Sequence, residues 1–362
     1  ITTLTQLFRF MKKALFLIAI VLGCTTVFAQ KIDKNEAKQI KAFLSQNAEK
    51  DGTNAQALKV TDLNAIASIE GITVANGHIT AIEWKDKHLA GDLDLSGFTA
   101  LTKVDVSRNH LSSINFSGNT ALSEVNASRN VLTSVNFKGC SNLYKVTVYK
   151  NRLTDMEIGD VPLIKDLNVS NNRFAELNVS NSTTLETLNC QGNHLESLLV
   201  TGCAALKNLY CGYNKLTQLN LLGVENLANL NIDDNEISTM YIQGLTALRT
   251  LICSDNNMTS LGLSNCTNLI DLVCSYNDLT TLSVEGCPNL TFVDCSYNDL
   301  TTLNLSNLNF LQRLICNNNQ LNTVDVSFDN ALVYINCRYN QITDFRTIAC
   351  PNLRMIACQW NY

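Results

Sequence analysis

Cysteine is the residue type with the most chemical potential in this chain, because fourteen cysteines could form disulfides or hold a metal ion. Their spacing argues against both uses. Eight recur in one register at multiples of 21 residues: Cys190, Cys211, Cys253, Cys274, Cys295, Cys316, Cys337 and Cys358. Five recur in a second register: Cys140, Cys203, Cys266, Cys287 and Cys350. No C-x-x-C pair occurs and no histidine shares a register with the thiols, so no metal site is expected.

Two uses of the repeating cysteines remain open. Neighbours in the first register would lie about 5 Å apart on adjacent strands, which is within disulfide reach by Cα distance. Their side chains would point in parallel into a core, however, and that geometry is poor for bridging. A buried free cysteine acts as a small apolar residue. We therefore expect a row of buried free thiols, with disulfides between neighbours as the alternative.

The remaining reactive side chains form no catalytic pattern. The four histidines are His78, His88, His110 and His194. None stands in a triad pattern, and the sequence contains neither a glycine-rich phosphate loop nor H-E-x-x-H. Acidic residues gather at 233–236, with Asp255 one repeat later, and a solvated acidic rim explains them better than a calcium site does. The sequence thus predicts no enzyme, no cofactor and no metal.

The positions of all these groups depend on a repeat, which is marked by an asparagine that returns every 21 residues. It occurs at Asn109, Asn130, Asn151, Asn172, Asn193, Asn214, Asn235, Asn256, Asn277, Asn298, Asn319, Asn340 and Asn361. A strict period of this length indicates a solenoid, in which each repeat is one coil stacked on its neighbours. Solenoids are typical of binding proteins rather than enzymes.

Each asparagine stands in the same frame. Residues 269–279 read LIDLVCSYNDL and residues 290–300 read LTFVDCSYNDL. The alternation before the asparagine predicts a short strand. The asparagine follows it at a turn, where its amide can pair with backbone groups that would otherwise lack partners. Further apolar residues two, five and seven places after the asparagine complete an inward-facing set of about seven per coil.

The frame L-x-x-L-x-C-x-x-N-x-L resembles the leucine-rich repeat. It looks most like the 21-residue, cysteine-bearing bacterial class that includes internalin J, and the resemblance covers about residues 77–362. It implies a leucine-rich repeat solenoid with a parallel β-sheet on the concave face. It also implies that the asparagines form a ladder binding the backbone of adjacent coils. The motif is specific for the fold and identifies no partner.

The charge balance and the N-terminal region limit the possible partners and the location of the protein. The balance of 27 basic and 32 acidic residues leaves no basic stripe, so nucleic acid is not expected as a partner. Residues 11–29 read MKKALFLIAIVLGCTTVFA, which predicts a secretory signal peptide, and residues 1–10 are interpreted as upstream translation. The run VLGC also resembles a lipoprotein box, so lipidation of Cys24 is the alternative to simple secretion. Membrane attachment is expected only in that case.

Residues 30–76 are predicted to cap the first coil. A helix is expected near 33–48, with Asp33 and Glu36 forming a capping box. The first coil is irregular, with Lys87 in place of the asparagine and Trp84 in place of the cysteine. The array, 77–362, stops within a coil at Tyr362. This ending is interpreted either as a fragment of a longer protein or as an end over which Trp360 and Tyr362 fold.

Aromatic and basic residues provide the candidate binding surface. The sheet is expected to present the residues six, four and two places before each asparagine, and its edge the residue just before it. The candidate site residues are Tyr149, Tyr210, Tyr213, Tyr276, Phe292, Tyr297, Arg313, Tyr334, Arg338, Tyr339 and Trp360. Exposed tyrosine, tryptophan and arginine are typical of recognition hot spots. The alternative is that aromatic residues of neighbouring coils stack and only stabilise the edge.

These observations lead to one functional hypothesis and one alternative. The hypothesis is a secreted or cell-surface, monomeric, non-enzymatic protein that binds a protein or glycan on its concave face, with adhesion as one such role. The alternative is a structural spacer or display stalk within a longer envelope protein.

Overall fold

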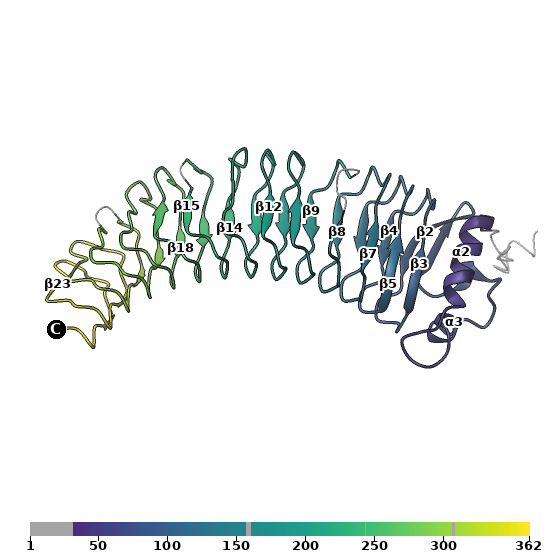
Figure 1. Cartoon of the computed structure of the whole chain (residues 1–362), viewed down its shortest axis with the longest axis horizontal. Helices are drawn as coiled ribbons and strands as arrows, with labels where there is room; N and C mark the ends of the chain where they lie inside the picture. The colour runs from purple at the N-terminus through teal and green to yellow at the C-terminus, as the bar shows by residue number, and fades with distance from the viewer. Residues whose placement is uncertain (1–31, 157–160, 243, 306–307) are drawn as a thin grey trace, which may run out of the picture.

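The computed structural model describes residues 32–156, 161–242, 244–305 and 308–362, which form one curved stack of coils. A helical cap lies at one end of the arc and the C-terminus at the other (Figure 1). Within these ranges, no helix has the length and apolar character needed to cross a membrane. The predicted signal peptide and Cys24 lie outside the described residues.

A long sheet runs through the stack, and each coil, named here by its asparagine, adds one strand to it. Most strands occupy the positions six to four residues before the asparagine and pair in parallel with the same positions one coil later. Asp271, Phe292 and Arg313 are partners in this register. The strands are β1 (Ile72–Ala75), β2 (His78–Glu83), β4 (Lys103–Asp105), β6 (Glu124–Asn126), β8 (Lys145–Thr147), β9 (Asp166–Asn168), β11 (Thr187–Asn189), β13 (Asn208–Tyr210), β14 (Asn229–Asn231), β16 (Thr250–Ile252), β18 (Asp271–Val273), β19 (Phe292–Asp294), β20 (Arg313–Ile315), β22 (Tyr334–Asn336) and β24 (Met355–Ala357).

Shorter parallel ladders occupy the second half of the coil, and the sequence pattern alone did not predict them. Most of their strands use the residues four to six places after the asparagine, where one buried side chain lies between two outward ones. Their strands are β3 (Ala90–Asp94), β5 (His110–Asn115), β7 (Ser134–Asn136), β10 (Glu176–Asn178), β12 (Ser197–Leu199), β15 (Thr239–Tyr241), β17 (Ser260–Gly262), β21 (Thr323–Asp325) and β23 (Asp344–Arg346). Three residues are too few for the alternation to identify a strand.

The core lies between the two sets of strands. In the Asn277 coil the buried side chains are Leu272, Cys274, Leu279, Leu282, Val284, Cys287 and Leu290, the inward set that the repeat predicts. Each one stacks on its counterparts 21 residues away. The interior is therefore one continuous apolar column rather than a single central core.

The cap consists of α2 (Lys34–Leu44), α3 (Asn54–Ala57) and a 3₁₀ turn, η1 (Ile66–Ser68). Ile40, Phe43 and Leu44 bury the inner face of α2, and the Phe43 ring stacks on Trp84 with centroids 5.8 Å apart. Strand β1 pairs antiparallel with β2 and closes that end of the long sheet. These elements cover the first coil, as the end of a solenoid requires.

Only one of the two hydrogen-bonding arms of the predicted capping box forms: the Asp33 side chain caps the helix, but the Glu36 side chain does not. The Asp33 carboxylate accepts hydrogen bonds from the Asn35 and Glu36 amides, at 2.8 and 3.2 Å. The Glu36 side chain does not return to Asp33, because it turns inward to His78 and the Ile79 amide. Docking of the helix onto the first coil overrides the local motif.

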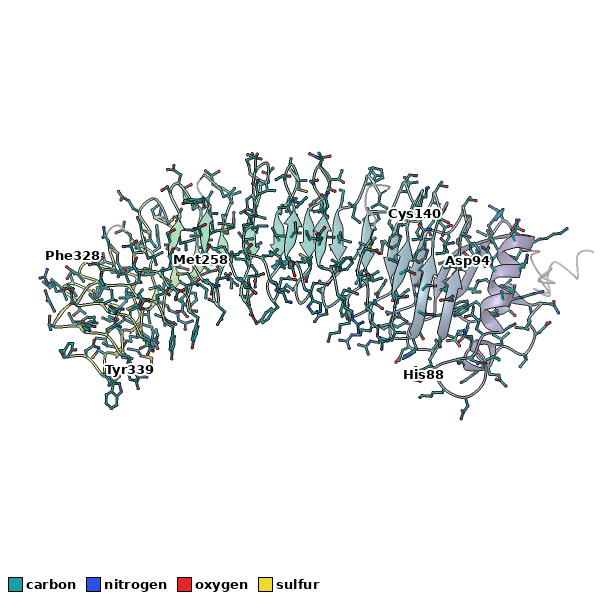
Figure 2. All side chains as sticks on the ribbon, viewed as in Figure 1. His88, Asp94, Cys140, Met258, Phe328 and Tyr339 are labelled. Carbon is teal, nitrogen blue, oxygen red and sulfur yellow. The ribbon has the colours of Figure 1, made fainter. Side chains whose placement is uncertain are left out.

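The arc curves toward the turns that contain the asparagines. Figure 2 places Tyr339, just before Asn340, on the inner side of the arc, together with His88, which follows Lys87 at the equivalent turn of the first coil. Phe328 lies on the outer side. The residue just before each asparagine therefore contributes to the concave surface.

Candidate binding surface

The residue just before each ladder asparagine has a left-handed backbone. Its φ ranges from 50° at Asp234 to 65° at Trp360. This region favours glycine, asparagine and aspartate, and several coils use them there, as at Gly192 and Asn171. Other coils instead place an aromatic residue at this position: Tyr213, Tyr276, Tyr297, Tyr339 and Trp360. Aromatic residues are disfavoured at such backbone angles, yet they occupy this position in five coils. The sequence did not indicate that these positions are left-handed.

The asparagines hold these turns to the preceding coil. Asn277 Nδ2 donates to the Cys253 and Cys274 carbonyls at 3.0 and 3.2 Å, and its Oδ1 accepts from the Met258 amide at 3.0 Å. The same pattern extends from Asn109 to Asn361. A rigid turn edge results, on which the preceding side chains are displayed at a fixed spacing.

Four of the aromatic residues at this edge stack in two pairs. The Tyr276 and Tyr297 centroids are 4.2 Å apart with planes 9° apart, and the Tyr339 and Trp360 centroids are 5.8 Å apart with planes 6° apart. Asn318 occupies the coil between the pairs. All four side chains stay substantially exposed, from 43% for Tyr297 to 70% for Trp360. These four aromatic side chains therefore stack on one another and also remain accessible to a ligand.

Arg313 joins aromatic residues on the sheet face of the same coils. Its guanidinium carbon lies 5.1 Å from the Phe292 centroid and 5.7 Å from the Tyr334 centroid. These residues open the adjacent strands β19, β20 and β22. A guanidinium held between two rings keeps its charge and its outward N–H donors available to a ligand.

The other candidate residues lie apart from this group or make different contacts. The Arg129 guanidinium lies over the Tyr149 ring and its Nε donates to the Tyr149 hydroxyl at 3.0 Å, which lowers the pKa of Tyr149. Tyr213 lies beside Asp233, whose charge raises the pKa of the tyrosine. Tyr210 is half-buried at the end of β13. The structure therefore does not bring these earlier tyrosines into the late group.

The side chain two places before the asparagine is buried in most coils. The prediction that the sheet presents this position to solvent is therefore wrong for most coils. Ser296 is 5% exposed, because its hydroxyl turns back to donate to Asp294 Oδ1 at 2.6 Å. Arg338 is an exception: its side chain is exposed and its Nε donates to Gln359 Oε1 at 2.5 Å.

The described cysteines are free thiols, and they are buried except for the partly exposed Cys350 and the exposed Cys358. Burial raises the pKa of Cys190 to about 12 and that of Cys337 to about 11. In the second register the thiol takes part in the backbone network, since Cys266 Sγ donates to the Ile242 carbonyl at 3.1 Å. These thiols pack the interior and are not poised as nucleophiles.

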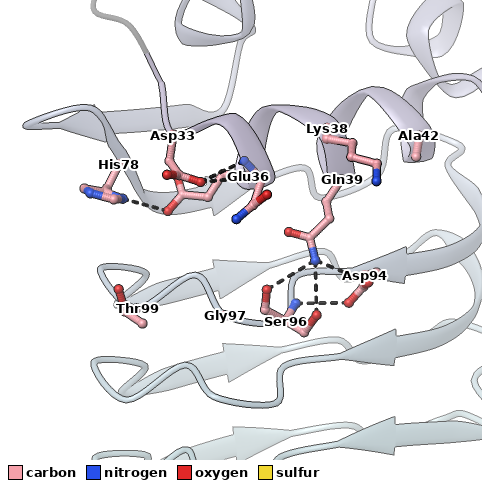
Figure 3. A pocket seen from close by; sticks show the side chains of 11 residues that line it. Asp33, Glu36, Lys38, Gln39, Ala42, His78, Asp94, Ser96, Gly97 and Thr99 are labelled. Carbon is pink, nitrogen blue, oxygen red and sulfur yellow. Dashed lines mark hydrogen bonds and ion pairs between the residues drawn. The ribbon is translucent and has the colours of Figure 1, made fainter.

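A cavity of about 690 Å³ lies between α2 and the first coil (Figure 3). Glu36 is 3% exposed, and its carboxylate accepts from the Ile79 amide at 2.8 Å and pairs with His78 Nδ1 at 2.9 Å. This hydrogen bond raises the pKa of His78. Gln39 Nε2 donates to Asp94 and Ser96 across the same space. These contacts of Glu36 and Gln39 fasten the cap to the first coils.

The acidic residues at 233–236 and Asp255 belong to adjacent coils. Across the described ranges, no three histidine, cysteine or acidic side chains are grouped so that they could hold an ion. The pKa of Asp255 is raised by burial and by the neighbouring Asp234. His110 lies near Glu49 of the cap, and His88 Nδ1 donates to the same carboxylate at 3.0 Å.

Known structures share this architecture. No protein-family model matches the sequence, and no curated protein does. A leucine-rich repeat protein of Leptospira interrogans has a TM-score of 0.65 at 20% identity, over 76% of this chain and 79% of that one. An internalin, InlF, of Listeria monocytogenes has a TM-score of 0.65 at 18% identity, over 91% and 98%.

The functional domain of InlJ from Listeria monocytogenes, which includes a cysteine ladder, is similar at 26% identity and a TM-score of 0.57. The match covers 80% of this chain and 56% of that domain, so the chain spans little more than half of it. The 21-residue coils and the buried cysteines agree with these matches. The protein is a leucine-rich repeat solenoid whose 21-residue, cysteine-bearing coils resemble those of the internalin J domain.

Proposed function

We propose that this protein is an exported, non-enzymatic binding protein that recognises a protein or glycan ligand outside the cell. The ligand would contact the late aromatic surface, defined as Tyr276, Phe292, Tyr297, Arg313, Tyr334, Arg338, Tyr339 and Trp360. The signal-peptide pattern at 11–29 supports export. The leucine-rich repeat fold supports a binding role in general.

The arrangement around Arg313 is the observation that carries this proposal. An exposed arginine held between Phe292 and Tyr334 is a pre-ordered cation, so little side-chain entropy is lost when a ligand binds. Arginine and aromatic residues on a rigid surface carry most of the energy at recognition sites. Tyr297 and Tyr339 add exposed aromatic area at backbone positions that disfavour such residues.

Arrays of purified extracellular proteins and of glycans, probed with the wild-type chain and with Arg313→Ala, test the proposal. The expected result is a reproducible ligand whose affinity falls at least about tenfold in the variant, as for a hot spot worth about 1.4 kcal/mol or more. Arg129→Ala is the matched control, because Arg129 also covers a tyrosine ring but lies in an early coil. Equal binding by wild type, Arg313→Ala and Arg129→Ala would contradict the assignment of this surface.

A further inference from the structure

The aromatic row at the turn edge is interrupted at one coil. In successive coils the residues before the asparagine are Tyr276, Tyr297, Asn318, Tyr339 and Trp360. Tyr297 stacks on Tyr276, and Tyr339 stacks on Trp360, so each pair uses the ring faces that point away from Asn318. Among the described residues, the faces of Tyr297 and Tyr339 directed toward Asn318 have no ring contact.

The Asn318 amide is free at this interruption. Its backbone is left-handed, with φ of 54°, so its side chain leaves the turn from the same position as the flanking tyrosines. In the part of the chain that the structure describes, this side chain makes no hydrogen bond, whereas Asn317 accepts from Asn336 and Asn319 belongs to the ladder. A half-buried amide with donor and acceptor capacity thus lies between two aromatic faces.

The spacing limits what can fit there. Two coil spacings separate Tyr297 from Tyr339, and at the ordinary strand spacing this amounts to about 9.6 Å between the two rings. A flat group in van der Waals contact with both rings needs only about 7 to 8 Å. The additional room suits a puckered saturated ring, whose axial hydrogens extend above and below its mean plane. Such a ring offers C–H groups to both tyrosines and hydroxyls to the Asn318 amide.

We propose that Tyr297, Asn318 and Tyr339 form a subsite for one pyranose ring of a carbohydrate ligand. This inference rests on the proposed function and specifies its ligand class. The rings would contact the two apolar faces of the sugar, and the amide would hydrogen-bond its edge. The favoured ligand is a glycan, and a flat protein side chain inserted between the rings is the competing outcome of the test.

Asn318→Tyr tests this proposal directly, because it closes the interruption with a ring at a backbone angle that Tyr297 already adopts. The probes are the methyl glycosides of glucose, galactose and N-acetylglucosamine, with p-cresol and N-methylguanidine as flat probes, observed by saturation-transfer NMR. The wild type is expected to bind at least one glycoside with Kd on the order of 1 mM. Asn318→Tyr should weaken this at least about tenfold without lowering Tm.

Asp255→Tyr is the matched control, because it adds a tyrosine at the same left-handed position beyond Tyr276 and leaves the interruption open. Its glycoside affinity should stay within about twofold of wild type. Tyr339→Asn, which removes one ring face, should weaken binding like Asn318→Tyr.

The subsite is wrong if Asn318→Tyr leaves glycoside binding unchanged. It is also wrong if a flat probe binds in an Asn318-dependent way and no glycoside binds. If no glycoside binds but Arg313→Ala abolishes binding of a protein ligand, the subsite is wrong and the proposed function stands. If neither experiment finds a ligand, both proposals fail.

Discussion

Tyr276 and Tyr297 lie face to face, with ring centroids 4.2 Å apart, although the backbone of each is left-handed, with φ of 54° and 53°. Two effects therefore oppose each other at these positions. An aromatic pair contributes about 0.5 to 1.5 kcal/mol beyond its buried area, whereas each left-handed non-glycine residue costs about 1 to 3 kcal/mol. Stacking therefore offsets only part of the backbone cost of the two positions, so stability alone does not account for the two tyrosines.

Replacing Tyr297 by asparagine should therefore change the free energy of unfolding by less than about 1 kcal/mol, because lost stacking is offset by a better backbone preference. Chemical denaturation measures this. The same variant should weaken ligand binding if the late aromatic surface is the site. A loss of stability much larger than 1 kcal/mol would show that the tyrosine pair serves mainly to hold the edge together.

Replacing Asn256 by alanine should destabilise the chain by about 2 to 4 kcal/mol, because several buried backbone groups lose their partner together. Asn256 Nδ2 donates to the Ile232 and Ser254 carbonyls at 2.9 and 3.0 Å, and its Oδ1 accepts from the Ile237 amide at 3.0 Å. The neighbouring Asn257 is exposed and its side chain makes no hydrogen bond in the described part of the chain. Asn257→Ala is therefore the control for denaturation experiments, and equal effects of the two substitutions would contradict the ladder role.

Replacing Asp329 by cysteine should stabilise the chain above pH 7 by about 1 kcal/mol. The effect stays this small because solvent partly screens the carboxylate. Asp329 stands where other coils have a cysteine, and burial raises the pKa of its carboxyl to about 6. Because the folded state holds this proton more tightly than the unfolded state, wild-type stability falls as pH rises from about 4 to above 6. Thermal unfolding between pH 4 and 8 measures this, and Asp329→Asn should also remove the dependence. A stability difference that does not change with pH would exclude this origin.

Replacing Glu36 by alanine should loosen the cap locally and cost about 1 to 3 kcal/mol, because the buried Ile79 amide loses its acceptor. Hydrogen exchange should speed up in β1 and β2, which lie against the cap, and stay unchanged in the distant strand β20. Lys34→Ala, on the exposed side of α2, is the control. Uniformly faster exchange along the whole array would instead mean that the cap governs global stability.

Thiol labelling of the native chain under non-reducing conditions should modify Cys358 first and Cys350 more slowly, and should leave Cys253 and Cys295 unmodified. The first two are exposed or partly exposed, whereas burial holds the pKa of the others far above its ordinary value. Peptide mass mapping identifies the labelled residues, and labelling in denaturant provides the full reference. Native labelling of Cys253 or Cys295 would contradict the packed column.

Much of the architecture follows from the sequence alone. The period places residues 21 apart on neighbouring coils, so Asp271, Phe292 and Arg313 had to become strand partners, and the inward set from Leu272 to Leu290 had to stack. The helix of the cap was also predictable from Asp33 and the apolar face of Ile40 and Phe43. Periodicity specifies these features because it fixes both backbone path and burial.

The tertiary structure decided what each displayed side chain does. Glu36 left its local capping partner for His78, because burial against the first coil satisfies more groups. Ser296 and Ser170, each two places before an asparagine, turned back to the strand, whereas the Arg338 side chain did not. Arg313 lies between two rings, and the amide of Asn318 is left free between two tyrosines. A repeat pattern gives the position of a side chain, but its rotamer and contacts depend on the neighbours that folding brings beside it.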